Sequence, residues 1–353
     1  MNTTLSPLAL QQKIRQGEII ESLILNNDSL IGVRLAGAVF IDVVFDRVVF
    51  SQHHLDDCMF DRCRLDQGDF HLGTLTRCRF NHCSLDRALF TGCRLENNLF
   101  NHCSLQGSRW REASLTGCHL LQSDLKQAFF DRTALNTVTL FKTPLPQGML
   151  QDCQVTLCTI FDLSLRSTRF TGNRFERCVF FNCDHRGNDY REQQFISCQF
   201  NDSRMDGVDF SRSILTQSSF SGASLKGACL EGIQGDRALF IGSDLQDAAC
   251  RNSRFNQGQF IRAQLQRADF SHSTLVQCLF HHASLNCSRL FACDLTYADF
   301  SRADLGECDL REAIFKRTLL HRANQRQAAF SQRQGLVEQD DALYAAEQWS
   351  EKT

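Results

Sequence analysis

The side chains of this sequence that could carry out chemistry are its 18 cysteines and 11 histidines. Thiolate and imidazole groups are the usual ligands of zinc, and an activated thiolate can also serve as a nucleophile. The segment NHCSL at 81–85 recurs letter for letter at 101–105, so His82 is matched by His102 and a cysteine follows each of them. A metal site would pair these histidines. The alternative, which we favour, is a stacked column of polar surface residues with the cysteines turned inward.

The placement of the cysteines favours packing over chemistry. Most cysteines lie at one recurring position, two residues before a bulky apolar residue. Ala, Ser, Thr and Gly also occupy this position, and only Cys229, Cys250 and Cys287 lie outside it. We therefore expect small, buried, unpaired thiols in a reducing compartment. The other fifteen all occupy that position: Cys58, Cys63, Cys78, Cys83, Cys93, Cys103, Cys118, Cys153, Cys158, Cys178, Cys183, Cys198, Cys278, Cys293 and Cys308.

The bulky residues themselves recur at every fifth position from Leu25 to Phe330 without an insertion or deletion. A period of five fits neither a strand nor a helix, and it marks a repeat architecture. The exceptions at this position are His185, Gly235, Cys250 and Gln325.

Phenylalanines at this position also recur at intervals of twenty, as at 40, 60, 80 and 100 and again from 180 to 300. Leucines dominate the column five residues later. A coil of twenty residues with four sides predicts these columns, with neighbouring coils about 4.8 Å apart. One coil cannot bury its apolar face alone, so the stability must come from contacts between neighbouring coils.

The repeat resembles that of the pentapeptide-repeat family, written A-(D/N)-L-x-x, which 303–305 (ADL) and 268–270 (ADF) match closely. The resemblance covers about nine-tenths of the chain. It implies an all-β solenoid, a right-handed quadrilateral parallel β-helix of about 15 coils over residues 25–330, with short helical caps at 1–24 and 331–353.

Both ends contain helix signals. Ser6-Pro7 resembles an N-cap followed by a proline at the first helical position, and Gly17 ends that turn. At the other end, residues 336–349 are predicted to be helical, with four apolar residues close to one face. This second helix is expected to cap the last coil, to bind a partner or a second copy of the chain, or to do both. The apolar residues of this face and their aromatic neighbour are Leu336, Leu343, Ala346, Trp349 and Tyr344.

Three patches depart from the repeat. The segment 142–148 contains Pro144 and Pro146, which we expect to remove two backbone donors and to weaken the ladder. The segment 184–194 places His185 among the axial residues and Tyr190 at the next axial position, and we interpret His185 as a core or turn histidine satisfied by the backbone. The segment 231–235 leaves an axial site unfilled at Gly235. Each patch could be a kink or a shallow binding patch, and we treat residues of the first two as candidate interaction sites. A tolerated defect in a long repeat is the more frequent case.

The composition limits the function. The formal net charge is −2, which argues against direct nucleic-acid binding, and no run of residues is apolar enough to span a membrane. No phosphate-binding glycine loop, zinc-spaced Cys/His pair or nucleophile elbow occurs. We therefore expect no enzymatic activity, no catalytic residues, no metal and no cofactor. A surface active site remains as a third and least favoured hypothesis.

Two non-catalytic functions follow from the resemblance. The first is a bacterial, cytoplasmic scaffold for protein–protein interaction, which could be an effector or a component associated with type VI secretion and exported by that system. The second is a DNA mimic that binds and protects a type II topoisomerase such as DNA gyrase, dimerising through its C-terminal helix. The balanced charge fits the first better, because mimicry of DNA requires an acidic surface.

Overall fold

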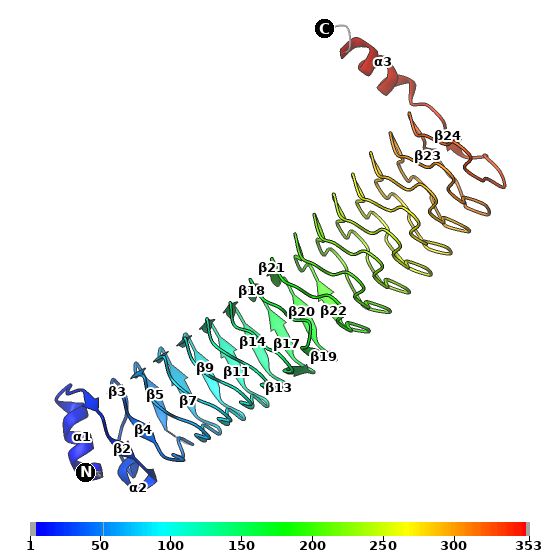
Figure 1. Ribbon diagram of the computed structural model, residues 1–353. Coiled ribbons are helices and arrows are strands. Elements are labelled where there is room, and N and C mark those ends of the chain that lie inside the picture. The colour runs from blue at the N-terminus through cyan, green and yellow to red at the C-terminus, as the bar shows by residue number, and fades with distance from the viewer. Residues whose placement is uncertain (1–4, 52, 351–353) are drawn as a thin grey trace. The chain divides into compact units, whose positions relative to one another are not determined.

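The computed structural model describes residues 5–51 and 53–350. Residues 1–4, 52 and 351–353 lie outside the described residues, so the two terminal segments can be compared with expectation only over 5–24 and 331–350. The chain forms a parallel β-solenoid (Figure 1) of about 16 turns. Its contacts divide it into two units, residues 1–179 and 180–353. The predicted β-helix is confirmed, with one turn more than expected.

The first unit consists of short parallel strands stacked coil on coil, preceded by two helices. Three of its sheets run along the unit in the orders β1-β3-β6-β8-β10-β12-β15-β18, β5-β7-β9-β11-β14-β17-β20 and β13-β16-β19, and β2 pairs with β4. The helices are α1 (Pro7–Arg15) and α2 (Asn27–Leu30), and the strands are β1 (Ile20–Glu21), β2 (Ile24–Leu25), β3 (Val39–Ile41), β4 (Val44–Phe45), β5 (His54–Asp56), β6 (Met59–Asp61), β7 (Thr74–Thr76), β8 (Arg79–Asn81), β9 (Arg94–Glu96), β10 (Leu99–Asn101), β11 (Ser114–Thr116), β12 (His119–Leu121), β13 (Phe129–Asp131), β14 (Ala134–Asn136), β15 (Thr139–Phe141), β16 (Met149–Gln151), β17 (Gln154–Thr156), β18 (Thr159–Phe161), β19 (Arg169–Thr171) and β20 (Arg174–Glu176).

In the second unit most sides of the coil are held by single bridging residues. Asp244 bridges Gln264 and Ala249 bridges Asp269, always in parallel and always twenty residues apart. The named elements of this unit are β22 (Gln194–Ile196), β23 (Thr318–Leu319), β24 (Leu336–Val337) and α3 (Asp341–Ser350), while β21 (Val179–Phe181) spans the boundary between the units. The same offset of twenty holds in the first unit, where Phe60 lies opposite Phe80. One coil is therefore twenty residues, as the spacing predicts.

The axis of each unit is filled by columns of stacked rings. In the first unit, Phe60 and Phe80 stack with ring centroids 4.7 Å apart and planes 1° apart. In the second, Phe200 stacks on Phe180 at 4.8 Å and on Phe220 at 5.0 Å. These distances equal the spacing between strands, so the ring stacking and the backbone ladder reinforce each other.

The small residues beside the axis do more than fill space. The thiol of Cys293 donates to the carbonyl of Phe270 at 2.9 Å, and the hydroxyls of Ser253 and Thr318 donate to carbonyls at 2.7 Å. In each case the acceptor is an axial residue 23 positions earlier. Cysteine, serine and threonine are thus interchangeable here because each is small and each donates to a buried carbonyl. Cysteine at this position is therefore small, buried and unpaired as expected, and it also donates a hydrogen bond.

The N-terminal end follows the sequence signals. The hydroxyl of Ser6 caps α1 by accepting from the amide of Ala9 at 3.3 Å, and Gly17 takes a positive φ of 70° after the helix. The first coil strand, however, is already present at Ile20, five residues before the expected start at Leu25. The first coil therefore begins before the clean part of the repeat.

The C-terminal end differs from expectation. Leu336 and Val337 form β24, which pairs with β23, and α3 begins only at Asp341. The prediction that the helix starts at Leu336 is wrong, because this residue takes part in the ladder of the last coil. Gly335 makes the close approach feasible, with φ at +91° and a backbone against which a Cβ atom would collide.

Candidate interaction surfaces

Helix α3 is attached to the solenoid at Glu347 and at its N-terminal end, and Arg322 lies over the ring of Tyr344 at 5.6 Å. Glu347 lies 2.5 Å from Arg302, 2.8 Å from Arg322 and 3.2 Å from Nε2 of the buried His321. The Arg302 guanidinium, which donates to this carboxylate, holds the pKa of Glu347 below its usual range. The other ring nitrogen of His321 accepts from the amide of Asp340, at the start of α3, at 3.2 Å. The helix is therefore anchored by polar contacts.

The apolar side chains of α3 remain exposed. Leu343 and Tyr344 are each 39% exposed and Trp349 is 71% exposed, and no residue of α3 is buried. The last coil is instead covered by β24 and by Arg333, whose guanidinium lies over the ring of Phe330 at 4.2 Å. The expected role of α3 as an apolar cap is therefore not what the contacts show.

The candidate residues of the segment 184–194 lie in the core. His185 and Tyr190 are 0% and 1% exposed, so neither side chain can reach a partner, which corrects their assignment as interaction residues. The Nδ1 atom of His185 pairs with the hydroxyl of Tyr190 at 2.7 Å and not with the backbone, while its Nε2 atom has no hydrogen-bond partner among the described residues. Asn188 also donates to that hydroxyl, at 3.0 Å. Burial lowers the pKa of His185 to about 3, so the imidazole is neutral.

The two prolines interrupt the ladder less than expected. In earlier coils the residue equivalent to Pro144 donates to a backbone carbonyl, as Asp124 does to Cys103, so one ladder bond is lost. The residue equivalent to Pro146 donates instead to a carboxylate side chain, as Gln106 does to Asp86. The carbonyls of both prolines still accept from the preceding coil at 2.9 Å. Pro144 is exposed and Pro146 half-buried, so both remain available at the surface.

The third irregular patch is not a void. A Cβ atom on Gly235 would lie only 3.2 Å from the side chains of both Ile233 and Phe255. Ile233 is a large residue at the position usually held by a small one, and it fills the space that Gly235 leaves. The expectation of an unfilled axial site is therefore wrong, because two neighbouring substitutions compensate each other.

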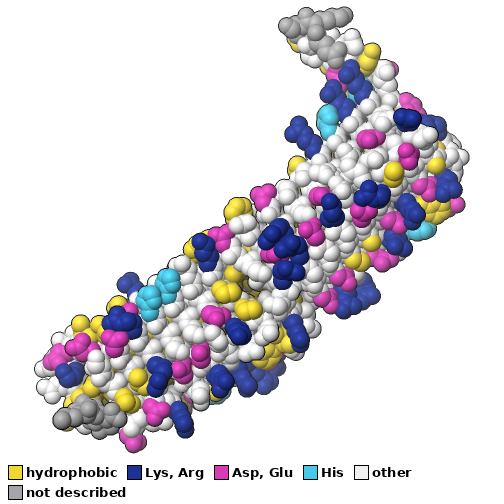
Figure 2. Space-filling view, viewed as in Figure 1, with side chains coloured by type: hydrophobic (Ala, Val, Ile, Leu, Met, Phe, Trp, Pro, Cys, Tyr) yellow, Lys and Arg dark blue, Asp and Glu magenta, His cyan; other side chains and the backbone are white. Residues whose placement is uncertain are grey.

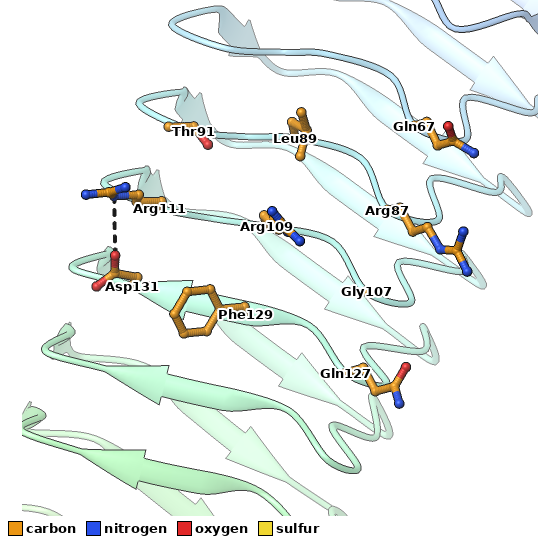
Figure 3. A pocket seen from close by; sticks show the side chains of 10 residues that line it. All are labelled: Gln67, Arg87, Leu89, Thr91, Gly107, Arg109, Arg111, Gln127, Phe129 and Asp131. Carbon is orange, nitrogen blue, oxygen red and sulfur yellow. Dashed lines mark ion pairs between the residues drawn. The ribbon is translucent and has the colours of Figure 1, made fainter.

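A groove that the sequence analysis did not anticipate lies on one side of the first unit (Figure 3). It is an open depression of about 1050 Å³ that extends over four successive coils. Figure 3 shows Gly107 at one corner between Arg87 and Gln127, where the missing side chain widens the depression. Its lining residues are Gln67, Arg87, Leu89, Thr91, Gly107, Arg109, Arg111, Gln127, Phe129 and Asp131. Arg87 and Arg109 have no ion-pair partner among the residues that the structure describes.

The sequence does contain a signal for this groove. Several exposed arginines elsewhere pair with an acidic residue twenty positions earlier, as Arg62 does with Asp42 at 2.9 Å. Around Arg109 the positions twenty residues away hold Leu89 and Phe129. A search for arginines without an acidic residue one coil away would have included Arg87 and Arg109, together with arginines outside the groove such as Arg79.

The repeated histidines and the cysteines beside them are arranged as packing residues. The rings of His82 and His102 stack at 4.9 Å with planes 5° apart, as predicted, while Cys83 and Cys103 are buried. Within residues 5–51 and 53–350, no group of three His, Cys, Asp or Glu side chains is placed to hold a metal ion. In the same ranges, no helix combines the length and apolar character that crossing a membrane requires.

The family model for pentapeptide repeats matches this chain in eight copies, over residues 99–133, 194–232, 236–271, 263–296 and 288–327. The chain belongs to the pentapeptide-repeat family. The match agrees with the coil of twenty residues, which holds four pentapeptides. No curated protein matches the sequence.

Solved structures of other pentapeptide-repeat proteins are similar to this one. The full-length QnrB1, a plasmid-mediated fluoroquinolone resistance protein, is 19% identical with a TM-score of 0.26, and the match covers 58% of this chain and 99% of QnrB1. HetL, involved in heterocyst differentiation regulation in the cyanobacterium Nostoc sp. strain PCC 7120, is 17% identical with a TM-score of 0.16, covering 90% of this chain and 96% of HetL. Rfr23 from the cyanobacterium Cyanothece 51142 is 14% identical with a TM-score of 0.14, and the match covers 44% of this chain and 91% of Rfr23.

Proposed function

We propose that this pentapeptide-repeat protein is a non-catalytic scaffold that binds other proteins, and that α3 joins it to a second copy of the chain. The observation that carries the proposal is the exposure of Leu343, Tyr344 and Trp349 on a helix that is itself firmly anchored through Glu347. Aromatic side chains on a preorganised element are the usual anchors of protein interfaces. A helix that only closed the solenoid would bury these residues.

The outer surface supports a scaffold better than a DNA mimic. On the face that Figure 2 shows, basic and acidic side chains are interspersed, and many form ion pairs between coils, such as Arg77 with Asp57 at 2.7 Å. A mimic of DNA needs a continuous acidic surface. Protection of a type II topoisomerase remains the second candidate, favoured by the exposed α3. If excess protein leaves gyrase supercoiling unchanged, this candidate is eliminated.

The self-association of α3 is tested by sedimentation equilibrium of the wild type and of Trp349→Ala. We expect a dimer that Trp349→Ala weakens by at least about tenfold, while Leu72→Ala, at another exposed apolar residue, leaves it unchanged. A monomeric wild type at high micromolar concentration would contradict the dimer. In that case α3 would still be available to a different protein.

The remaining parts of the proposal follow from the family resemblance. We place the protein in the bacterial cytoplasm, with export as an effector or an association with type VI secretion as its cellular context, and with Pro144 and Pro146 as further surface contacts. Affinity purification from native lysate followed by mass spectrometry tests this set. Recovery of no stoichiometric partner would contradict the scaffold, and turnover that survives repurification but is lost on one point mutation would contradict the non-catalytic role.

A further inference from the structure

The groove of the first unit presents a cation between two apolar side chains. Leu89, Arg109 and Phe129 are joined by successive parallel bridges, so they occupy one outward column on three neighbouring coils. Leu89 and Phe129 are half-buried and the guanidinium of Arg109 is exposed between them (Figure 3). The column therefore offers an alternation of apolar contact, positive charge and apolar contact at about 4.8 Å intervals.

The positive charges of the groove are not neutralised from within the chain. At several other arginines an acidic residue one coil away closes a short ion pair, as Asp247 does with Arg267 at 2.6 Å. Arg109 has Leu89 and Phe129 at the two equivalent positions, and Arg87 has Gln67 and Gly107. Neither arginine forms an ion pair within the described part of the chain, so both guanidinium groups can bind an external anion.

The acidic residues near the groove are already engaged. Asp131 lies 3.4 Å from Arg111, which has a second acidic neighbour, Glu112, at 3.7 Å. At the corner beside Arg87, one carboxylate oxygen of Asp86 accepts from the hydroxyl of Ser104 and from the amide of Gln106. Among the lining residues, three arginines face one aspartate, which leaves an excess of positive charge in the depression.

We infer that this groove binds an extended acidic segment of a partner protein. A carboxylate of the segment pairs with Arg109 and Arg87, and apolar side chains on either side of it contact Leu89 and Phe129. The inference rests on the proposed scaffold function and specifies the chemistry of its partner. The groove spans three intervals of about 4.8 Å, or about 14 Å, which four or five extended residues cover at about 3.3 Å each.

The partner docks through side chains and not by adding a strand. The amide of Arg109 already donates to Ala88 at 3.0 Å, and its carbonyl accepts from Phe90 at 2.8 Å. The backbone of the column is therefore used by the neighbouring coils, which leaves no free edge for β-augmentation. Specificity then depends on the side chains of Leu89, Arg109 and Phe129.

The same observations favour a peptide over a nucleic acid. Nucleic-acid binding depends on many phosphate contacts in series, whereas this groove offers two unpaired arginines. The carboxylates of Asp66, Asp86 and Asp131 close to the groove would repel successive phosphates. A peptide with a single acidic side chain between apolar ones can contact Leu89, Arg109 and Phe129 without bringing further negative charges close to those carboxylates.

The test uses the full chain and three fluorescein-labelled probes in fluorescence anisotropy at low salt. The probes are an eight-residue peptide with one central glutamate between two leucines and neutral polar residues elsewhere, the same peptide with lysine in place of the glutamate, and an eight-residue oligothymidylate. We expect the glutamate peptide to bind, the other two to bind at least about tenfold more weakly, and the binding to weaken several-fold at 0.5 M salt.

Variants then locate the site. Arg109→Glu should weaken binding of the glutamate peptide by at least about tenfold. Arg79→Glu is the matched control, because Arg79 is an exposed arginine between the apolar Met59 and Leu99 on strand β8, outside the groove. Circular dichroism checks that both variants fold.

Several outcomes overturn the inference. They are unchanged binding by Arg109→Glu, equal loss in Arg79→Glu, or binding of the oligothymidylate in preference to the peptide. A cellular partner that Arg109→Glu still captures but Trp349→Ala does not would overturn the groove assignment and leave the scaffold function standing. If Arg109→Glu no longer captures the partner but Trp349→Ala still does, the result supports both the groove assignment and the scaffold function.

Discussion

The guanidinium of Arg302 lies 2.5 Å from a carboxylate oxygen of Glu347, and this ion pair connects a coil of the second unit to helix α3. The same carboxylate contacts Arg322 and His321, and Arg322 also lies over the ring of Tyr344 at 5.6 Å. These contacts hold α3 in place while Leu343 and Trp349 remain exposed. The arrangement makes the exposed aromatic residues a preorganised surface.

Glu347→Gln should release α3 from the coil. The variant removes the charge that Arg302 and Arg322 bind, so hydrogen exchange of residues 341–350 should accelerate while the coils keep their protection. The control is Asp341→Asn, which removes a charge from the same helix without touching the coil. Because the Arg302 hydrogen bond holds the pKa of Glu347 below its usual range, the anchoring is present at neutral pH and is lost as the pH falls through this lowered pKa. Equal exchange in both variants would contradict this role.

The stability of the second unit should fall on mild acidification because of His185. Burial holds its pKa at about 3, whereas the unfolded chain has the ordinary value of 6.5, so the unfolded state binds a proton between these limits and the folded state does not. The free energy of unfolding should therefore drop by about 2 kcal/mol from pH 7 to pH 5. Urea denaturation at both pH values measures this loss, and His185→Leu should reduce it. A loss that persists unchanged in His185→Leu would show that other groups cause it.

Thiol reactivity should distinguish one cysteine from the rest. Cys287 is exposed and Cys229 half-exposed, whereas the other cysteines are buried, and burial raises the pKa of Cys93 and Cys293 to about 12. Ellman's reagent should modify one thiol rapidly and a second slowly in the native protein, and all 18 in urea. Cys287→Ser should remove the fast phase. Rapid native modification of many thiols would contradict the packing described above.

Gly335→Ala should detach the final strand. A Cβ atom there would lie against the carbonyl of Phe315, and the residue needs a positive φ of 91°. We expect a loss of about 1–3 kcal/mol, with faster hydrogen exchange at Leu320, whose amide donates to Val337 at 2.8 Å. Gly242→Ala is the control, because this glycine also has a positive φ but has no atom within 4 Å of an added Cβ. If both variants lose the same stability, the close contact at Gly335 is unimportant.

The architecture could be predicted from the sequence because a solenoid repeats its contacts with its nearest neighbours. Once the coil is twenty residues, Phe200 must lie on Phe220, and the small residues must lie beside the axis. The N-terminal helix was likewise predictable, since Ser6 and Gly17 act within a single turn of the chain. These features depend on local conformation and on one fixed register.

Other features were decided only in three dimensions. The position of α3 depends on Glu347 meeting Arg302 across 45 residues, and the start of α3 depends on Leu336 joining the last ladder. The compensation at Gly235 and the burial of His185 depend on how side chains from neighbouring coils share one space. The period of the sequence specifies which residues stack on one another. The contacts at the ends of the solenoid, inside its irregular coils and on its outer faces depend on where the side chains lie in the folded chain.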